Sequence, residues 1–315
     1  MIKQRSFITG IKSLNLSSKE KKFLNKYKPW GVILFSRNIK SIKQTKRLTD
    51  QIKNIFNNNK YPILIDQEGG RVNRLKKITN IKPLTSEYFG KLYLKDKKKF
   101  NRYYRVFIKE TSILLRLIGV NINTVPVLDL KFSGTSSIIG DRSFSHNPKI
   151  VSRIGNLCID YFHNNKIGTV IKHIPGHGLA KVDSHKQTPT IKNTLNYLSK
   201  NDFLTFKNKK SFFAMTAHII YSDIDKSYTA THSKKVLKLI RNRIKFKNLL
   251  MSDDISMKSL KGTIKENTRQ AFDAGCDLVL HCNGNYKEML EVAKNSPLLS
   301  EFIIKKTSQF YKILS

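Results

Sequence analysis

Cysteine is scarce in this sequence, and its few thiols are poorly spaced for cross-linking or metal binding. The 315 residues include three cysteines, Cys158, Cys276 and Cys282. Their odd number and the lack of any C-x-x-C pair argue against a disulfide framework and against a cysteine-based zinc site. The cysteine content is therefore typical of a reducing compartment, and we expect a cytoplasmic protein.

Long apolar runs are also missing. A membrane-spanning helix needs about 20 consecutive apolar residues. Although 39% of the residues are hydrophobic, no stretch approaches that length. The basic N-terminal segment MIKQRSFITGIKSLNLSSKEKK has neither a long apolar core nor a small-residue cleavage site, which argues against a secretory signal. We expect a globular protein with a sizeable core and no membrane partner.

Acidic residues are few relative to basic ones. The chain has 22 aspartates and glutamates against 59 lysines and arginines, which gives a net charge of +37. A basic nucleic-acid-binding face or a field that steers an anionic substrate would produce such a balance. However, the lysines are spread from Lys3 to Lys312, and isoleucine and asparagine, which share A/T-rich codons with lysine, are also abundant. We interpret the charge as compositional drift and expect no nucleic-acid partner, since no zinc finger, RNA-binding aromatic motif or basic heptad region is present.

Short apolar runs alternate with amphipathic stretches along the whole chain. The predicted strands are residues 6–11, 30–35, 61–66, 119–127, 168–173, 211–218, 248–254 and 276–282. Helical spacing of apolar residues appears in 41–56, 98–119, 233–244 and 298–314, with Ser233 at a predicted N-cap. Eight strand–helix repeats predict a parallel (β/α)8 TIM barrel rather than a doubly wound sheet, because no G-x-G-x-x-G opens a helix. No Pro-, Gly- or Ser-rich linker interrupts residues 1–315, so we expect a single domain.

Polar side chains follow six of the predicted strands at the point where each strand ends. In a parallel barrel these ends meet at one face, which carries the active site. The residues are Asp66, Asp129, Lys172 with His173, His218, Asp253 with Asp254, and His281 with Asn283. Their convergence predicts a catalytic or binding site at this face.

The most unusual segment is KHIPGHGLAKVDSHKQTP, residues 172–189, which holds three histidines and an aspartate. Pro175, Gly176 and Gly178 exclude a regular helix, so the segment must open into a loop. Pro175 also prevents His173 and His177 from taking the helical i, i+4 arrangement of a zinc-binding H-E-x-x-H motif. We therefore expect no metal here.

Four motifs together resemble those of glycoside hydrolase family 3. In chain order they are DQEGGRVNR (66–74), GDRSF (140–144), KHIPGHG with the following DSH (172–185), and MSDDISM (251–257). The resemblance extends from GVILFSRN (31–38) to AGCDLVLHCNGN (274–285) and is greatest to the single-domain bacterial β-N-acetylglucosaminidases of cell-wall recycling. Ile174 is a small departure, because the family often has phenylalanine there.

The resemblance implies a retaining exo-β-N-acetylglucosaminidase that removes terminal GlcNAc from peptidoglycan fragments such as GlcNAc-1,6-anhydro-MurNAc, with or without peptide. It implies no metal or organic cofactor, and we expect a monomer. Most enzymes that cleave glycosidic bonds use two carboxylic acids. Asp253, at the end of a strand, is a natural nucleophile, and the resemblance selects the same residue. A helix N-cap before ISMKSL is the structural alternative, and it suits Asp254 better.

The resemblance assigns the acid/base role to His185, with Asp183 as the residue that orients it. Imidazole can give and take a proton near neutral pH, and a neighbouring carboxylate fixes its tautomer. An Asx-turn is the structural alternative for the D-S-H sequence.

The sugar-binding residues implied by the resemblance are Asp66, Arg74, Arg142, Lys172 and His173. Glu68 is expected to buttress the loop, and Gly69 and Gly70 are expected to allow a tight turn there. Two other functions stay open at this point. One is a glycoside phosphorylase, since a neutral histidine repels phosphate less than a glutamate does. The other is a basic nucleic-acid-binding barrel with a decayed site.

Overall fold

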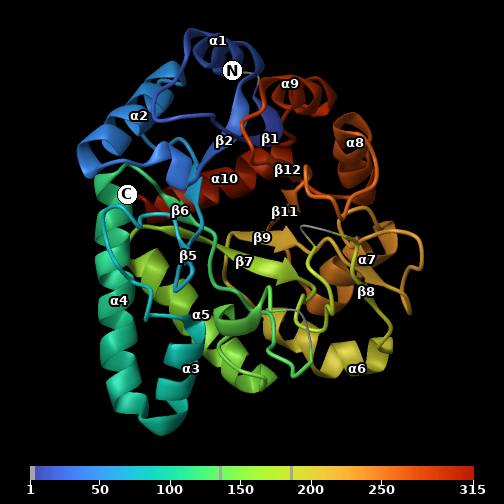
Figure 1. The fold of residues 1–315 in the computed structure, drawn as a ribbon. Coiled ribbons are helices and arrows are strands. Elements are labelled where there is room, and N and C mark those ends of the chain that lie inside the picture. Colours follow the sequence, from blue (N-terminus) through green and yellow to red (C-terminus); the bar gives the residue numbers. More distant parts are fainter. Residues whose placement is uncertain (1–3, 135–136, 185–186) are drawn as a thin grey trace.

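A computed structural model describes residues 4–134, 137–184 and 187–315. Eight parallel strands close into a barrel in the order β1-β12-β11-β9-β7-β6-β3-β2, and helices surround it (Figure 1). The barrel strands are β1 (Arg5–Gly10), β2 (Pro29–Leu34), β3 (Ile63–Ile65), β6 (Ile122–Asn123), β7 (Gly168–Ile174), β9 (Phe213–Thr216), β11 (Leu249–Asp254) and β12 (Leu278–His281). The predicted (β/α)8 barrel is confirmed, and each predicted strand overlaps one barrel strand.

The strands are apolar because both of their faces are buried. Along β1, Phe7 belongs to the large core between the strands and the helices, whereas Ile8 belongs to a second core inside the barrel. Along β2, Val32 and Ile33 divide between the two cores in the same way. Successive strand residues point to opposite faces of the sheet, so a continuous apolar run serves both cores.

Ten α-helices cover the outside of the described barrel. They are α1 (Ser18–Tyr27), α2 (Ile42–Ile55), α3 (Ser86–Lys95), α4 (Lys97–Leu117), α5 (Pro148–Asn164), α6 (Leu195–Lys200), α7 (Lys234–Leu239), α8 (Ile264–Ala274), α9 (Tyr286–Asn295) and α10 (Glu301–Ile313). The predicted helices 41–56, 98–119 and 298–314 correspond to α2, α4 and α10. The predicted helix 233–244 begins as expected, since the Ser233 side chain accepts a hydrogen bond from the Val236 amide. It then continues as a π-helical segment, Ile240–Ile244.

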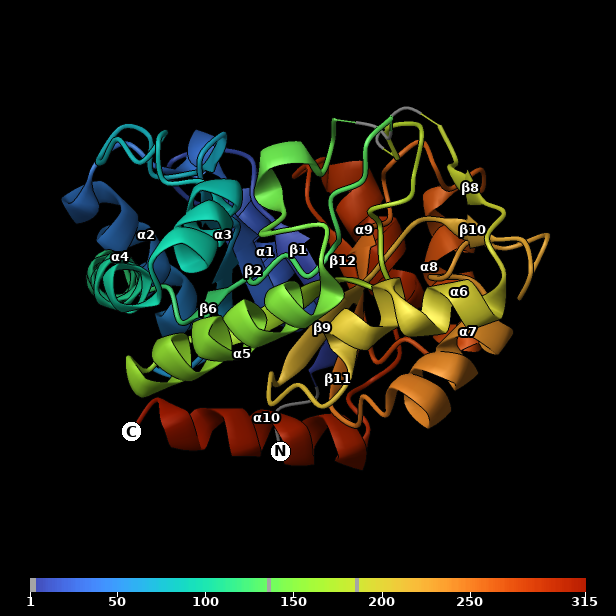
Figure 2. The same ribbon diagram turned by 90° about the horizontal axis from the view of Figure 1, so that it is seen from below.

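Helix α10 closes the end of the barrel where the strands begin (Figure 2). Phe310 packs edge-on against Phe213, with ring centroids 5.3 Å apart. The buried Trp30 indole donates a hydrogen bond from Nε1 to Thr307 Oγ1 over 2.9 Å. This seal leaves the opposite end, where the strands finish, as the face on which a site can form.

Two small sheets lie in the loops that follow barrel strands. The hairpin of β4 (Gln67–Gly69) and β5 (Val72–Asn73) comes directly after β3. The parallel pair β8 (Thr190–Ile191) and β10 (Ile220–Tyr221) joins the loops after β7 and β9. Among the described residues, no helix is long and apolar enough to cross a membrane.

Candidate active site

A cavity of about 310 Å³ opens at the end of the barrel where the strands finish. Its walls come from the loops after β3 and β6, from the end of β7 itself, and from the ends of β2, β9, β11 and β12. All five predicted sugar-binding residues and the predicted nucleophile line it: Asp66, Arg74, Arg142, Lys172, His173 and Asp253. The structure therefore brings together side chains from four distant parts of the sequence.

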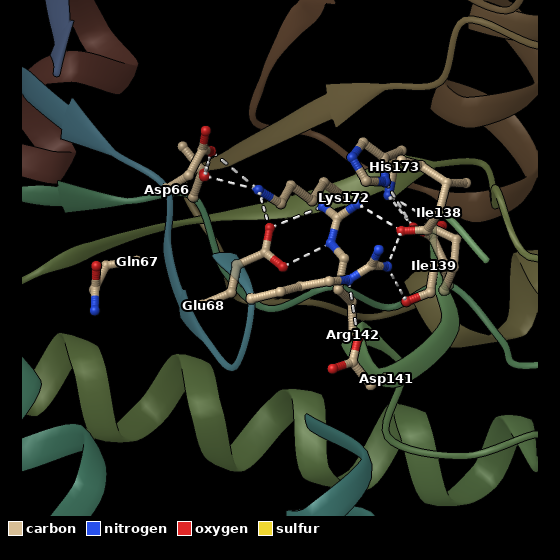
Figure 3. A network of polar contacts seen from close by, with 12 residues as sticks. Asp66, Gln67, Glu68, Ile138, Ile139, Asp141, Arg142, Lys172 and His173 are labelled. Carbon is tan, nitrogen blue, oxygen red and sulfur yellow. Dashed lines mark hydrogen bonds and ion pairs between the residues drawn. The ribbon is translucent and has the colours of Figure 1, made fainter. Parts of the chain in front are cut away.

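Five of the cavity residues form an ion-pair cluster, which consists of Asp66, Glu68, Arg74, Arg142 and Lys172. Figure 3 shows Asp66, Glu68, Arg142 and Lys172 of this cluster. The ammonium of Lys172 lies 3.1 Å from Asp66 Oδ1 and 2.7 Å from Glu68 Oε1. Its side chain is only 3% exposed. A buried ammonium is stable only when opposite charges and hydrogen bonds compensate it, and the two carboxylates supply both.

Glu68 and Arg142 meet through two parallel hydrogen bonds. Arg142 Nε donates to Glu68 Oε2 over 2.8 Å, and Arg142 Nη2 donates to Glu68 Oε1 over 2.9 Å. Burial by itself would raise the pKa of Glu68, but Arg142 and Lys172 outweigh it and hold this pKa at about 2. Glu68 is thus ionised at neutral pH, where it fixes the two cations that face the cavity.

Asp66 is the other anion of the cluster. Arg74 Nη2 donates to Asp66 Oδ2 over 3.0 Å, and the Thr124 hydroxyl donates to Asp66 Oδ1. Burial would raise the pKa of Asp66, yet Lys172 and Arg74 hold it well below its usual range. An ionised carboxylate at the cavity wall is an acceptor for sugar hydroxyl groups.

The β4–β5 hairpin has the turn that the DQEGGRVNR motif predicts. Gly69 and Gly70 both have positive φ, and a Cβ on Gly69 would lie 2.3 Å from the carbonyl oxygen of Leu84. Within β4, Glu68 points to the cluster whereas Gln67 points away from it (Figure 3). Arg71 ties the hairpin to the loop after β6, because it donates to the Ile138 carbonyl over 2.6 Å and pairs with Asp141 over 3.0 Å.

His173 belongs to a second polar group, centred on Asp129. His173 Nδ1 lies 2.6 Å from Asp129 Oδ2, and the backbone amide of His177 donates to Asp129 Oδ1 over 2.7 Å. Burial would raise the pKa of Asp129, but His173 outweighs it and lowers the pKa. The sequence marks Asp129 as a strand-end aspartate without a role. In the structure it orients the ring of a cavity residue.

Asp253 and Asp254 end β11 and both line the cavity, but their carboxylates have different hydrogen-bond partners. The Asp254 amide donates to Asp253 Oδ1 over 2.7 Å, and Asp253 lines the cavity. The carboxylate of Asp254 accepts from the Ser256 amide over 3.0 Å and from the Cys282 amide over 3.3 Å. No helix follows the pair, since residues 255–260 form turns and bends, so the structural alternative of a helix N-cap does not apply. Asp254 stabilises such a turn rather than a helix N-terminus.

The loop after β7 carries the predicted acid/base pair. Asp183 is half-buried, and its backbone carbonyl accepts a hydrogen bond from the Gln187 amide over 3.1 Å. It is not one of the described residues that line the cavity. His185 lies outside the described residues. Earlier in the loop, the buried His177 ring meets the Ser184 hydroxyl at 3.0 Å.

The described part of the chain contains no group of three or more His, Cys, Asp or Glu side chains arranged to hold a metal ion. All three cysteines are free and buried. The titratable side chains that line the cavity are four carboxylates, four cations, the His173 imidazole and the Cys282 thiol.

The sequence matches one family over nearly its whole length and is similar to several known proteins. Residues 2–310 match the glycosyl hydrolase family 3 N-terminal domain. A β-hexosaminidase of Methylobacillus flagellatus is 32% identical over 261 residues, which cover 80% of this chain and 73% of that one. A β-hexosaminidase of Neisseria meningitidis is 32% identical over 287 residues, 88% of this chain and 77% of that one.

Solved structures share the fold. NagZ from Neisseria gonorrhoeae in complex with N-trifluoroacetyl-D-glucosamine superimposes with a TM-score of 0.85 and 28% identity, covering 98% of this chain and 90% of that one. A family 3 β-N-acetylglucosaminidase from a Paenibacillus species has the same TM-score, 0.85, at 24% identity, and this chain covers 60% of it.

Proposed function

The chain belongs to glycosyl hydrolase family 3, and on that premise we propose that this glycoside hydrolase is a retaining exo-β-N-acetylglucosaminidase acting on peptidoglycan fragments. Its β-N-acetylhexosaminidase activity agrees with the β-hexosaminidases to which it is similar. The finer substrate, GlcNAc-1,6-anhydro-MurNAc with or without peptide, is the part that requires experiment. The three free thiols support action in a reducing compartment, and we propose the cytoplasm.

One observation carries the proposal: Asp253 lines the same cavity as the ion-pair cluster. A sugar held by Asp66, Arg74 and Lys172 would therefore have a carboxylate within the same enclosed space. Hydrogen bonds from charged groups are stronger than neutral ones and fix orientation. Such fixation places the anomeric carbon against one carboxylate, as a nucleophilic displacement requires.

The proposed first step is attack by the Asp253 carboxylate on the anomeric carbon. The bond from that carbon to the glycosidic oxygen breaks, and the leaving oxygen takes a proton from His185. The product of this step is a glycosyl-enzyme ester on Asp253. The Asp254 amide donates to Asp253 Oδ1 over 2.7 Å and so orients the carboxylate for this attack.

The second step reverses the proton transfer. His185 removes a proton from water, and the water attacks the anomeric carbon and releases Asp253. Two displacements retain the β configuration. Asp183 would orient the His185 ring and stabilise its cationic form, as the aspartate of a Ser-His-Asp triad does.

The experiment that tests the proposal is hydrolysis of a chromogenic β-GlcNAc glycoside, with and without inorganic phosphate. We expect release of GlcNAc at a rate that phosphate does not change. Formation of GlcNAc 1-phosphate would instead assign a phosphorylase. No turnover, together with tight duplex DNA binding at physiological salt, would favour the decayed nucleic-acid-binding barrel.

The stereochemical course is tested by proton NMR early in the reaction. A retaining enzyme releases the β-anomer first. Initial α-anomer would mean inversion, which requires a general base in place of a nucleophile.

A further inference from the structure

The end of β11 is held from outside the cavity by a buried histidine that the proposed mechanism does not use. His218 follows β9 and is 1% exposed. Its Nε2 lies 3.0 Å from the backbone carbonyl oxygen of Asp254. A carbonyl can only accept, so Nε2 must carry the hydrogen and donate it.

The other ring nitrogen is also engaged. His218 Nδ1 lies 2.7 Å from Thr231 Oγ1, and Thr231 Oγ1 lies 2.8 Å from the hydroxyl of Thr216. With Nε2 protonated, Nδ1 accepts from Thr231, which in turn accepts from Thr216. Both threonines are fully buried. The chain of three hydrogen bonds fixes the plane and the tautomer of the imidazole.

The backbone of Asp254 connects His218 to Asp253. Its carbonyl accepts from His218, while its amide donates to Asp253 Oδ1 over 2.7 Å. Rotation of the Asp254 backbone would break one or both contacts, and it would turn the Asp253 carboxylate. Burial lowers the pKa of His218 although Asp253 opposes that shift, so the imidazole stays neutral and donates through Nε2 alone.

We propose that His218 is a positioning residue that aims the Asp253 carboxylate through the backbone of Asp254. It touches neither the substrate nor the reacting atoms. The inference rests on the proposed role of Asp253 as nucleophile. A displacement of about 1 Å at a reacting group costs about 100-fold in rate, so loss of the hold should appear in the attack step and leave sugar binding almost unchanged.

The test compares His218→Met, which has similar bulk but no donor, with His218→Gln, whose amide can donate near the position of Nε2. The probe is an activated fluorosugar of GlcNAc, which Asp253 attacks with loss of fluoride. We expect His218→Met to label 10- to 100-fold more slowly, with KM for the chromogenic glycoside within about twofold of wild type. His218→Gln should recover most of the lost rate.

His232→Met is the matched control. His232 lies in the same region, and its Nε2 lies 3.1 Å from the Asn267 carbonyl, away from β11. Substitution of His232 should lower the melting temperature of the protein but not the labelling rate per active site. The number of active sites is taken from the end-point of the labelling reaction. Thr231→Val removes only the hydroxyl that orients His218, and it should slow labelling less than His218→Met does. This variant allows the test to be made even if His218→Met does not fold.

Labelling of His218→Met at the wild-type rate, or an equal loss in the Met and Gln variants, would overturn the inference. So would an unchanged rate in Thr231→Val. Failure of the wild-type protein itself to react with the fluorosugar would contradict the proposed nucleophile instead, so the two failures are distinguishable.

Discussion

The ion-pair cluster and the loop after β7 lie at the same end of the barrel, but their buried charges are paired to different extents. Within the cluster, only Arg74 Nε is a buried polar atom without a hydrogen-bond partner among the described residues. In the cluster, each buried charge has a partner of opposite sign within 3.1 Å. Beside the loop, His177 Nδ1 and both carboxylate oxygens of Asp202 are buried and have no hydrogen-bond partner among the described residues. Asp202 lies against the start of the loop, because a Cβ on Gly176 would be 2.6 Å from the Asp202 Cβ.

The difference has consequences for how each region responds to change. Compensated charges resist displacement, since movement of one partner leaves the other uncompensated in a dry environment. A buried polar group without a hydrogen-bond partner destabilises the folded state. A different loop conformation, or protonation of the group, would reduce this cost. The comparison predicts a rigid sugar-binding wall and a loop whose stability depends on pH.

The largest effect should come from Asp253, which the strand end presents to the cluster. Asp253→Ala removes the proposed nucleophile and should lower turnover of the chromogenic glycoside by about four orders of magnitude. Binding of GlcNAc, followed by calorimetry, should change little, because the cluster that we propose holds the sugar is intact. Substantial activity in Asp253→Ala would transfer the nucleophilic role to another residue.

His185→Ala tests whether the loop after β7 supplies the general acid. It should lower turnover by about 100-fold or more on glycosides with poor leaving groups, which need protonation to depart. Formation of the glycosyl-enzyme from an activated aryl glycoside should be much less affected. Rates for a series of leaving groups measure this contrast, and equal losses across the series would exclude a general acid.

Asp183→Ala should reproduce this pattern more weakly, because the imidazole remains. If the two residues act as one unit, the double variant should lose less than the sum of the two single losses. Strict additivity would separate Asp183 from the acid/base function.

Glu68→Gln breaks the compensation within the cluster. It leaves Arg142 and Lys172 with one partner fewer and should cost about 3 kcal/mol or more of stability at pH 7, measured by urea unfolding. The folded pKa of Glu68, about 2, lies below the ordinary value of 4.5. Its stabilising contribution is therefore present above pH 4.5 and is lost as pH falls toward 2. The unfolding free energy of the variant should therefore decrease less than that of the wild type between pH 4.5 and pH 2. An equal decrease in both proteins would contradict the proposed stabilisation of ionised Glu68 by Arg142 and Lys172.

Asp202→Asn tests the unpartnered group beside the loop. Burial, then repulsion from Asp129, raises the pKa of Asp202 from 3.8 to about 7. Because the folded pKa of Asp202 is raised, its contribution to the free energy of unfolding is fully present below pH 3.8, the ordinary pKa. This contribution is lost as pH rises through about 7, the folded pKa. The difference in unfolding free energy between wild type and variant should therefore shift by up to about 4 kcal/mol between pH 4 and pH 8, in favour of the variant at high pH. A constant difference over this range would show that Asp202 has an ordinary pKa.

Salt should have the smallest effect. If the charge of +37 is drift, efficiency on a neutral GlcNAc glycoside and on an anionic muramyl fragment should respond alike as the Debye length shortens from about 30 to 10 Å. Stopped assays at two ionic strengths are sufficient. A steep decline for the anionic fragment alone would indicate that the charge steers the substrate.

The sequence by itself determined the barrel and the face that carries the site. Eight apolar runs separated by helical patterns allow few other folds, because strands buried on both faces must be apolar throughout. Asp66, Lys172 and Asp253 were identifiable from their positions at strand ends, which converge in any parallel barrel. The glycines of DQEGGRVNR predicted the tight turn, but the expectation that Glu68 buttresses the loop did not place this side chain at the cavity, where the structure has it.

Only the tertiary structure decided how those groups are partnered. Nothing local in the sequence pairs Glu68 with Arg142, orients His173 with Asp129, or connects His218 to Asp253 through Asp254. The surroundings of Asp254 were likewise decided by the tertiary structure, because its carboxylate accepts from the amide of Cys282, 28 residues away. Hydrogen bonds of this kind depend on distances between separate strands, and these are set when the barrel closes.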